Sequence, residues 1–99
     1  MDINFLDSKI PENVDAKKWG FYLWFVLFSI VFKYDASDEA KLHFKNLIYS
    51  LPHLLPCLSC RTEFLEIIRC NPLEGQILNS RKSLLKWLIL IKNKVDVKN

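Results

Sequence analysis

The sequence predicts an all-α protein, in which a four-helix bundle follows a short irregular segment of residues 1–15. The chain has 99 residues and two glycines, which is too few for the many tight turns of a β protein. Apolar side chains recur at helical spacing in segments that prolines and polar stretches separate. With 51% hydrophobic and 25% charged residues, the chain has the composition of a folded protein. Its length suits one domain, which we place at residues 16–99.

The first helix of the bundle is expected over residues 16–34, where the chain is apolar almost all round. Pro11 and the Asn and Asp residues around it argue against a long helix in the segment before. The apolar run WGFYLWFVLFSIVF, residues 19–32, is shorter than the roughly 20 residues that span a membrane. We therefore interpret it as a core helix or a subunit-interface helix, and association with a membrane surface stays open.

The second helix is expected to begin after Ser37, a plausible N-cap residue. Asp38 and Glu39 then fall in the first turn, where the helix dipole favours negative charge. Pro52 and Pro56 end the helix and shape a short bend. Its apolar residues share one face, because they follow helical spacing: Ala40, Phe44, Leu47, Ile48 and Leu51.

Two more helices complete the predicted bundle. The third begins around Cys57 and presents one side made of Cys60, Phe64, Ile67 and Ile68. Residues 70–80 are expected to form a loop, because they contain Pro72 and Gly75. The fourth helix is expected over residues 80–95, with a face made of Leu84, Leu88, Ile91 and Val95.

Two of the three cysteines stand in the motif PCLSC, residues 56–60. An odd number of cysteines does not suit a secreted disulfide framework. A structural zinc site needs four ligands, and beyond this pair the chain offers Cys70, His43 and His53, so no metal site is predicted. Two cysteines in the first turn of a helix can also simply fill a core. The residues alone leave core packing and redox chemistry both open.

The redox interpretation of PCLSC has a physical basis. A CxxC pair that opens a helix places its first thiol near unpaired N–H groups and the positive end of the helix dipole, which favours the reactive thiolate. Thioredoxin-like proteins use this arrangement, but they need β-strands, and no alternating strand pattern precedes Cys57. A redox dithiol on an all-helical frame would need a separate electron acceptor to form disulfides.

The order of motifs along residues 18–97 resembles the Erv/ALR family of FAD-linked sulfhydryl oxidases, in particular its short viral members. The matching stretches are WGFYLW, then LPHLLPCLSC, then SRKSLLKW and IKNKVD. The resemblance implies that FAD lies within the helical bundle, with Cys60 next to the flavin and Cys57 exchanging with the substrate. Electrons would pass from a substrate dithiol to FAD and then to oxygen, which gives hydrogen peroxide.

The family resemblance also implies a set of cofactor-binding residues. Phe28 stands where the family usually has a histidine, and Lys92 and Asp96 replace the histidine and second asparagine of an HNxVN motif. A lysine can still hold a phosphate by charge, although it cannot stack as an imidazole does. The residues implied to bind FAD are Trp19, Gly20, Trp24, Phe28, Trp87, Lys92, Asn93, Val95 and Lys98.

The resemblance implies a homodimer through the first two helices. Cys70 cannot form a shuttle disulfide alone, so the expected partner is a separate small protein with a CxxC or CxxxC pair, such as a thioredoxin-like protein. A net charge of +3 is too mild for a nucleic-acid groove. No signal peptide is recognisable, and the expected setting is host cytoplasm or virion.

The sequence leaves two alternative functions open. One is a helical interaction module that kept the fold but lost FAD, and the other is a small zinc-binding adaptor.

Overall fold

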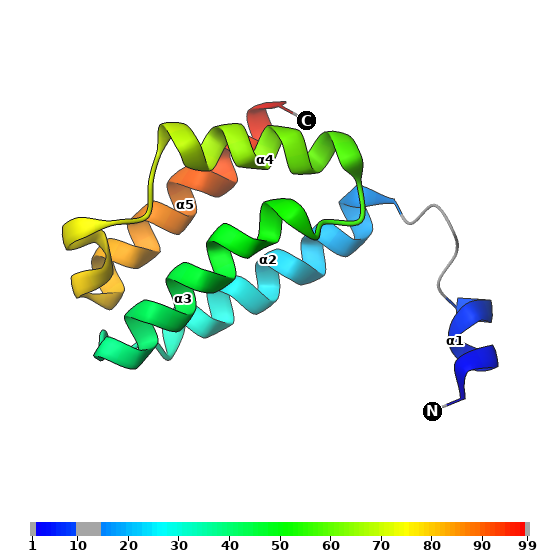
Figure 1. The fold of residues 1–99 in the computed structure, drawn as a ribbon, viewed down its shortest axis with the longest axis horizontal. Helices are drawn as coiled ribbons and strands as arrows, with labels where there is room; N and C mark the ends of the chain where they lie inside the picture. The colour runs from blue at the N-terminus through cyan, green and yellow to red at the C-terminus, as the bar shows by residue number, and fades with distance from the viewer. Residues whose placement is uncertain (1, 10–14, 99) are drawn as a thin grey trace.

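A computed structural model describes residues 2–9 and 15–98, and within them every regular element is helical (Figure 1). The prediction of an all-α protein is therefore confirmed. The α-helices are α1 Ile3–Lys9, α2 Ala16–Phe32, α3 Asp38–Ser50, α4 Leu58–Cys70 and α5 Arg81–Lys98. Two short 3-10 helices join them, η1 Leu51–His53 and η2 Gly75–Asn79.

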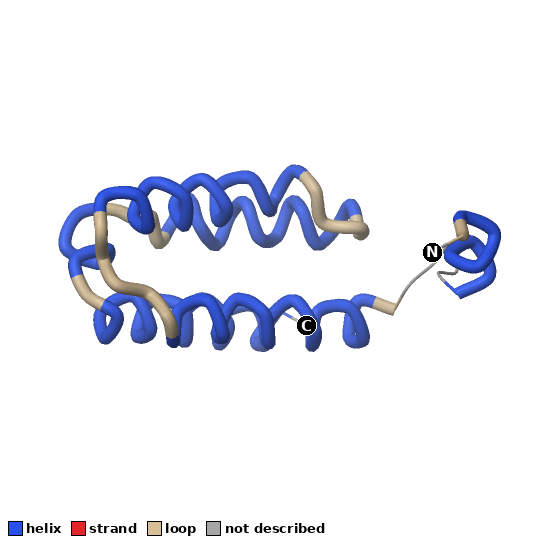
Figure 2. The backbone as a smooth tube through the Cα atoms, turned by 90° about the horizontal axis from the view of Figure 1, so that it is seen from below, coloured by secondary structure: helices blue, strands red, loops and turns tan. Residues whose placement is uncertain are grey.

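Helices α2 to α5 form the predicted four-helix bundle. They lie in two layers, α2 with α5 and α3 with α4 (Figure 2). Helix α5 packs against both α2 and α4, and η1 contacts α3 and α4. The largest fully buried side chains come from all four helices and the loop after α4: Leu27, Ile48, Ile68, Leu73, Leu84, Leu88, Ile91 and Val31.

The predicted irregular segment is wrong for residues 3–9, which form helix α1. The Asp2 carboxylate accepts a hydrogen bond from the backbone N–H of Asn4 at 3.1 Å, and so satisfies one of the free donors of the first turn. Pro11, on which the prediction depended, lies outside the described residues. Figure 1 shows α1 apart from the bundle.

Local signals place the boundaries of the bundle helices. The Ser37 hydroxyl accepts from the backbone N–H of Ala40 at 3.1 Å, as its predicted N-cap role requires. Asp15 caps α2 in the same way, accepting from the N–H of Lys17 at 3.0 Å. The expected loop after α4 contains η2, whose first residue, Gly75, has a φ of 64°. Glycine adopts this left-handed conformation without the strain that a Cβ would add.

Side chains tie the loops together at the end of the bundle where α2 ends and α5 begins. The buried Tyr34 hydroxyl donates to the carbonyl of Leu78 in η2. Arg81 donates to the carbonyl of Phe32 at 3.1 Å, across the junction of α2 and α5. The Tyr49 hydroxyl accepts from the N–H of Leu73 at 2.9 Å. This end of the bundle is closed, and the candidate site lies at the other.

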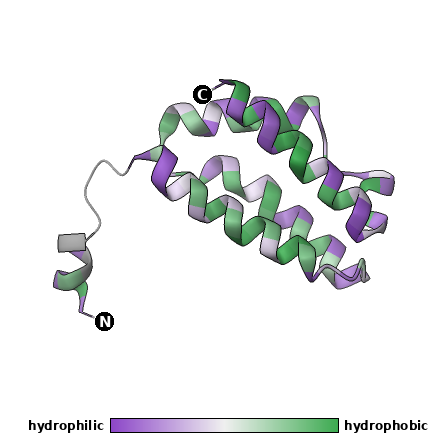
Figure 3. Cartoon of the chain, turned by 180° about the vertical axis from the view of Figure 1, so that it is seen from behind, coloured by the Kyte–Doolittle hydropathy of each residue, from purple (hydrophilic) through white to green (hydrophobic). Residues whose placement is uncertain are grey.

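Helix α2 is hydrophobic beyond what the core uses, and its ribbon in Figure 3 is largely green, the colour of hydrophobic residues. Leu27 and Val31 are buried, whereas Phe21, Phe25 and Val26 keep half or more of their surface exposed. Within the described ranges, no helix is both long enough and apolar enough to cross a membrane. The apolar outer face of α2 is taken up below.

Candidate active site

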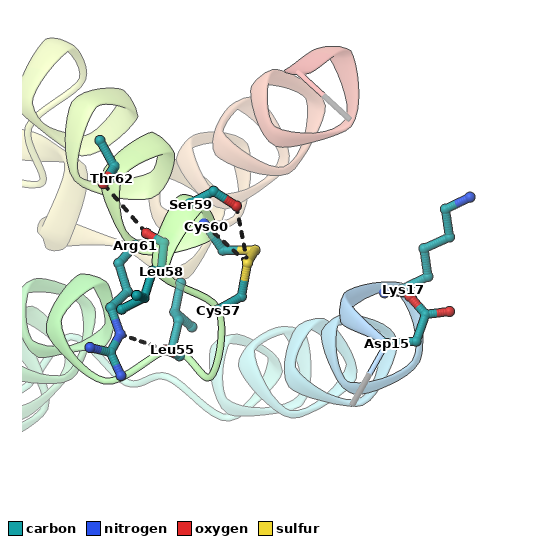
Figure 4. Close-up of a disulfide and its surroundings, with 9 residues drawn as sticks. All are labelled: Asp15, Lys17, Leu55, Cys57, Leu58, Ser59, Cys60, Arg61 and Thr62. Carbon is teal, nitrogen blue, oxygen red and sulfur yellow. Dashed lines mark hydrogen bonds between the residues drawn. A yellow bond between two sulfur atoms is a disulfide. The ribbon is translucent and has the colours of Figure 1, made fainter. Parts of the chain in front are cut away.

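Cys57 and Cys60 form a disulfide at the start of α4, with their Cα atoms 5.2 Å apart. Cys57 is the N-cap residue of the helix, and its Sγ accepts the backbone N–H of Cys60 at 3.2 Å. The same Sγ lies 3.3 Å from the Ser59 hydroxyl oxygen (Figure 4). Cys57 therefore sits at the positive end of the helix dipole, where a thiolate released by reduction would be stabilised.

The bend between α3 and α4 positions Cys57 at the N-terminus of α4. The backbone N–H groups of Leu54 and Leu55 both donate to the carbonyl of Leu51, which closes the turn. Leu55 is 7% exposed and anchors the bend in the core. The Arg61 side chain then donates from Nε to the Leu55 carbonyl at 2.6 Å, which joins the bend to the first turn of α4.

A cleft of about 690 Å³ opens beside the disulfide, and Cys60 forms part of its wall. This volume lies within the range of about 300–1,000 Å³ that is typical of small-molecule and cofactor sites. The walls come from α2 between Ala16 and Phe28, from α4 between Cys60 and Ile67, from the last turns of α5, and from Asp15 and Leu55. The cleft therefore occupies the end of the bundle opposite the closed loops.

Aromatic rings form much of the cleft wall. The Trp24 ring lies 6.5 Å from the Phe64 ring and 6.2 Å from the Phe28 ring, measured between centroids. The Lys92 ammonium lies 5.9 Å from the Trp24 ring centroid, within the range of a cation–π interaction. Such a wall suits a flat aromatic ligand that carries acceptors or negative charge.

Polar groups on the cleft wall point to the same kind of ligand. The indole N–H of Trp19 is buried and has no hydrogen-bond partner among the described residues. A buried donor of this kind is costly to leave unpaired, so an acceptor on a ligand would satisfy it. Lys92 pairs with Asp96 at 2.9 Å, which keeps its ammonium at the cleft. These features fit FAD, which combines a flat flavin ring with a negatively charged diphosphate.

The structure brings most of the predicted cofactor residues together, and separates some. Trp87 is buried in the core, where its indole N–H donates to the Asn71 carbonyl at 3.0 Å. Asn93 and Lys98 are exposed and lie outside the cleft lining as the described residues form it. The cofactor role stays a prediction for these three and for the six that line the cleft. The predicted residues that line the cleft with Cys60 are Trp19, Gly20, Trp24, Phe28, Lys92 and Val95.

Sequence reasoning missed several residues of the cleft wall. Glu63, Phe64 and Ile67 follow Cys60 at three, four and seven residues, so they share its helix face. This spacing is visible in the sequence, where Phe64 and Ile67 are expected to be core residues. Glu63 brings a carboxylate to the cleft beside the disulfide.

Cys70 lies at the other end of α4, exposed, and its thiol donates to the Glu66 carboxylate at 3.5 Å. Arg69, hydrogen-bonded to Glu66, lowers the pKa of that carboxyl, and the Cys70 thiol adds to the effect. Cys70 is the last residue of α4, beside an ionised carboxylate, whereas Cys57 caps the N-terminus of the same helix. The environment of Cys70 is thus opposite to that of Cys57.

The histidines do not lie in the cleft wall. His43 and His53 are both exposed, on α3 and in η1. Among the residues that the structure describes, no group of three or more His, Cys, Asp or Glu side chains could hold a metal ion.

Residues 21–99 match the family model described as Erv1/Alr. The chain belongs to the Erv1/Alr family. The resemblance seen in the sequence is therefore confirmed.

Two relatives of this Erv1/Alr chain come from viruses. The chain is 32% identical over 85 residues to a protein of Acanthamoeba polyphaga mimivirus that is named an FAD-linked sulfhydryl oxidase. It is 28% identical over 88 residues to a protein of Invertebrate iridescent virus 3 that bears the same name. The alignments cover 84% and 87% of this chain but 59% of each relative. The chain thus spans rather more than half the length of these relatives.

Proposed function

We propose that this chain is an FAD-dependent thiol oxidase that forms disulfides in partner proteins. The observation that carries the proposal is the Cys57–Cys60 disulfide, which has one cysteine at a helix N-terminus and the other in the wall of an aromatic cleft. Membership of the Erv1/Alr family and the names of the two viral relatives support the same activity.

The chemistry of the dithiol follows from these positions. A substrate thiolate attacks Cys57 Sγ, the disulfide bond breaks, and Cys60 leaves as a thiolate. A second substrate thiolate then attacks the mixed disulfide, which releases oxidised substrate and leaves Cys57 reduced. The N-terminus of α4 stabilises the negative charge on Cys57, and the proton of each substrate thiol passes to solvent.

Bound FAD would supply the electron sink, since a flavin can accept the electron pair of the Cys57–Cys60 dithiol and pass it to oxygen, which gives hydrogen peroxide. Trp24 and Phe28 would hold the flavin ring, and the indole N–H of Trp19 would donate to an acceptor on the cofactor. Lys92 offers positive charge to the diphosphate. Cys60, as the cleft-lining cysteine, is the one that faces the cofactor.

The visible absorption spectrum of the purified protein tests the proposal. We expect flavin bands near ~450 nm that bleach when dithiothreitol is added without oxygen, because the dithiol passes its electrons to the flavin. The bands should return when air is admitted. A protein that stays colourless after incubation with FAD would contradict the proposal and favour the alternative, a helical interaction module that no longer binds the cofactor.

Cys70, a single thiol at the far end of α4, does not supply the substrate dithiol. Cys70 stands ten residues after Cys60 on the same helix, about 15 Å along its axis. A disulfide needs Cα atoms roughly 4.4–6.8 Å apart, so Cys70 cannot bond to Cys60 within one chain. We propose a small partner protein with a CxxC or CxxxC dithiol, in the host cytoplasm or virion of a virus.

We also propose a homodimer through α2 and α3. A second groove, of about 870 Å³, lies between these helices, and its wall includes Val26, Ile30 and Leu47. Val26, Ile30 and Leu47 are 51%, 39% and 36% exposed and share this groove, and a contiguous apolar patch of this kind marks an interaction site. A second copy of the same face would bury these side chains, which explains why α2 is apolar all round.

The substitution Val26→Glu should disrupt this dimer, because a carboxylate would be buried without a partner. We expect the dissociation constant to rise at least tenfold, or about 1.4 kcal/mol. Sedimentation or light scattering would measure it, with flavin content as the check on folding. The control is Leu90→Glu, on α5, where Leu90 is 43% exposed. Equal effects of both variants, or a monomeric wild type, would contradict the proposed face.

A further inference from the structure

Besides the peptide bond to Leu58 and the hydrogen bonds of Cys57 Sγ described above, three contacts attach the bend that carries Cys57 to α4. The disulfide is the first. The second is the backbone, where the Arg61 N–H donates to the Cys57 carbonyl at 3.0 Å as the first helical bond. The third is the Arg61 side chain, whose Nε donates to the carbonyl of buried Leu55 at 2.6 Å (Figure 4). Arg61 therefore holds both Cys57 and the residue two positions before it.

The helix dipole makes the position of Arg61 unfavourable for a positively charged side chain. Helix α4 begins after Cys57, so Arg61 follows its first turn, close to the positive end of the dipole. The side chain is partly buried, and it turns back toward the bend to reach the carbonyl of Leu55. A carbonyl inside a bend has few other donors within reach, so this bond also satisfies a backbone acceptor.

We propose that Arg61 is a positioning residue for thiol–disulfide exchange at Cys57. The inference rests on the proposed function, since it concerns the same dithiol. Each catalytic cycle breaks the Cys57–Cys60 bond and thereby removes the cross-link between the two side chains, while the backbone stays continuous from Cys57 into α4. The Arg61–Leu55 hydrogen bond persists through that step. It keeps Cys57 beside Cys60, so the two thiols close again into a disulfide rather than drift apart.

Two substitutions separate the hydrogen bond from the charge. In Arg61→Gln the amide nitrogen occupies the place of the arginine Nε, so the donor remains while the charge is lost. In Arg61→Met a methyl group occupies that place, so both are lost. If the bond positions Cys57, Arg61→Gln should behave like the wild type and Arg61→Met should not.

The measured quantity is the equilibrium between the Cys57–Cys60 pair and glutathione. The full-length, FAD-loaded protein is equilibrated with defined ratios of reduced and oxidised glutathione without oxygen. Its free thiols are then alkylated, and mass spectrometry measures the fraction of protein in which Cys57 and Cys60 are reduced. In Arg61→Met the reduced state gains freedom, so the equilibrium constant for closing the disulfide should fall roughly fivefold, the effect of one hydrogen bond. In Arg61→Gln it should change less than twofold.

Two outcomes would overturn the inference. One is an equal shift in both variants, which would assign the effect to charge. The other is a lower melting temperature in Arg61→Met with an unchanged glutathione equilibrium, which would make Arg61 purely structural. A failure of the proposed function would show up in a different experiment, in which dithiothreitol leaves the wild-type flavin unbleached. The glutathione equilibrium is measured by mass spectrometry and does not use the flavin signal.

Discussion

Replacing either Cys57 or Cys60 by serine should abolish oxidation of a dithiol, whereas Cys70→Ser should keep most of the activity. A serine oxygen cannot form the disulfide that accepts substrate electrons, so either change removes the electron path to the cofactor. Cys70 lies at the far end of α4 beside an ionised carboxylate, away from this path. Oxygen consumption and hydrogen peroxide release with dithiothreitol as substrate would measure all three variants.

The same variants distinguish the roles of the two cysteines. In Cys57→Ser the remaining Cys60 thiolate should stay against the flavin and give long-wavelength absorbance, because Cys60 lines the cleft. Cys60→Ser should lack this band. The assigned roles are reversed if Cys60→Ser shows it instead. A Cys70→Ser variant as inactive as the other two would mean that Cys70 belongs to the electron path.

The helical frame was predictable because each signal for it is local. Ser37 starts α3 through a side-chain bond to the third residue after it, and the prolines that flank Leu54 and Leu55 exclude a continuous helix. Helix α1 was missed because its start depends on Asp2, a residue that serves equally well in an irregular segment. Propensity alone does not decide between these uses of an aspartate.

The order of motifs in the sequence predicts which segments form the candidate site. It does not predict as well which residues of each helix face the cleft. On α5 the residues Leu84, Trp87, Leu88 and Ile91 form the buried stripe. Lys92 and Val95 lie on the neighbouring stripe, which lines the cleft. Trp87 was assigned to the cofactor from the motif, but the register places its ring in the core, against Asn71. A tertiary contact of that kind has no signature in sequence spacing.

The three departures from the family motifs can each be explained from a contact in the structure. Lys92 and Asp96, which replace a histidine and an asparagine of the family motif, are bonded to each other one helical turn apart. The pair replaces two neutral groups by two charges that neutralise each other, which lowers the cost of placing either at the cleft. Phe28 replaces another histidine with a ring that packs against Trp24.

The aromatic wall should contribute more to flavin affinity than the charge of Lys92. Trp24→Ala removes the ring that Phe28, Phe64 and Lys92 all contact, so we expect the dissociation constant of FAD to rise roughly 30-fold, or about 2 kcal/mol. Riboflavin, which shares the flavin ring but has no phosphate, should be weakened by a similar factor. Quenching of flavin fluorescence by the apoprotein measures both ligands.

Lys92→Met keeps the aliphatic stem and removes the charge, so it should weaken FAD roughly two- to fivefold and leave riboflavin unchanged. The control for both variants is Tyr22→Ala, because Tyr22 lies on the same helix as Trp24, is 61% exposed and lies outside the lining formed by the described residues. Circular dichroism would confirm that each apoprotein stays helical. If Trp24→Ala binds FAD as well as Tyr22→Ala does, the flavin does not lie against this wall. If Lys92→Met weakens riboflavin as much as FAD, Lys92 acts through the Trp24 ring and not through the diphosphate.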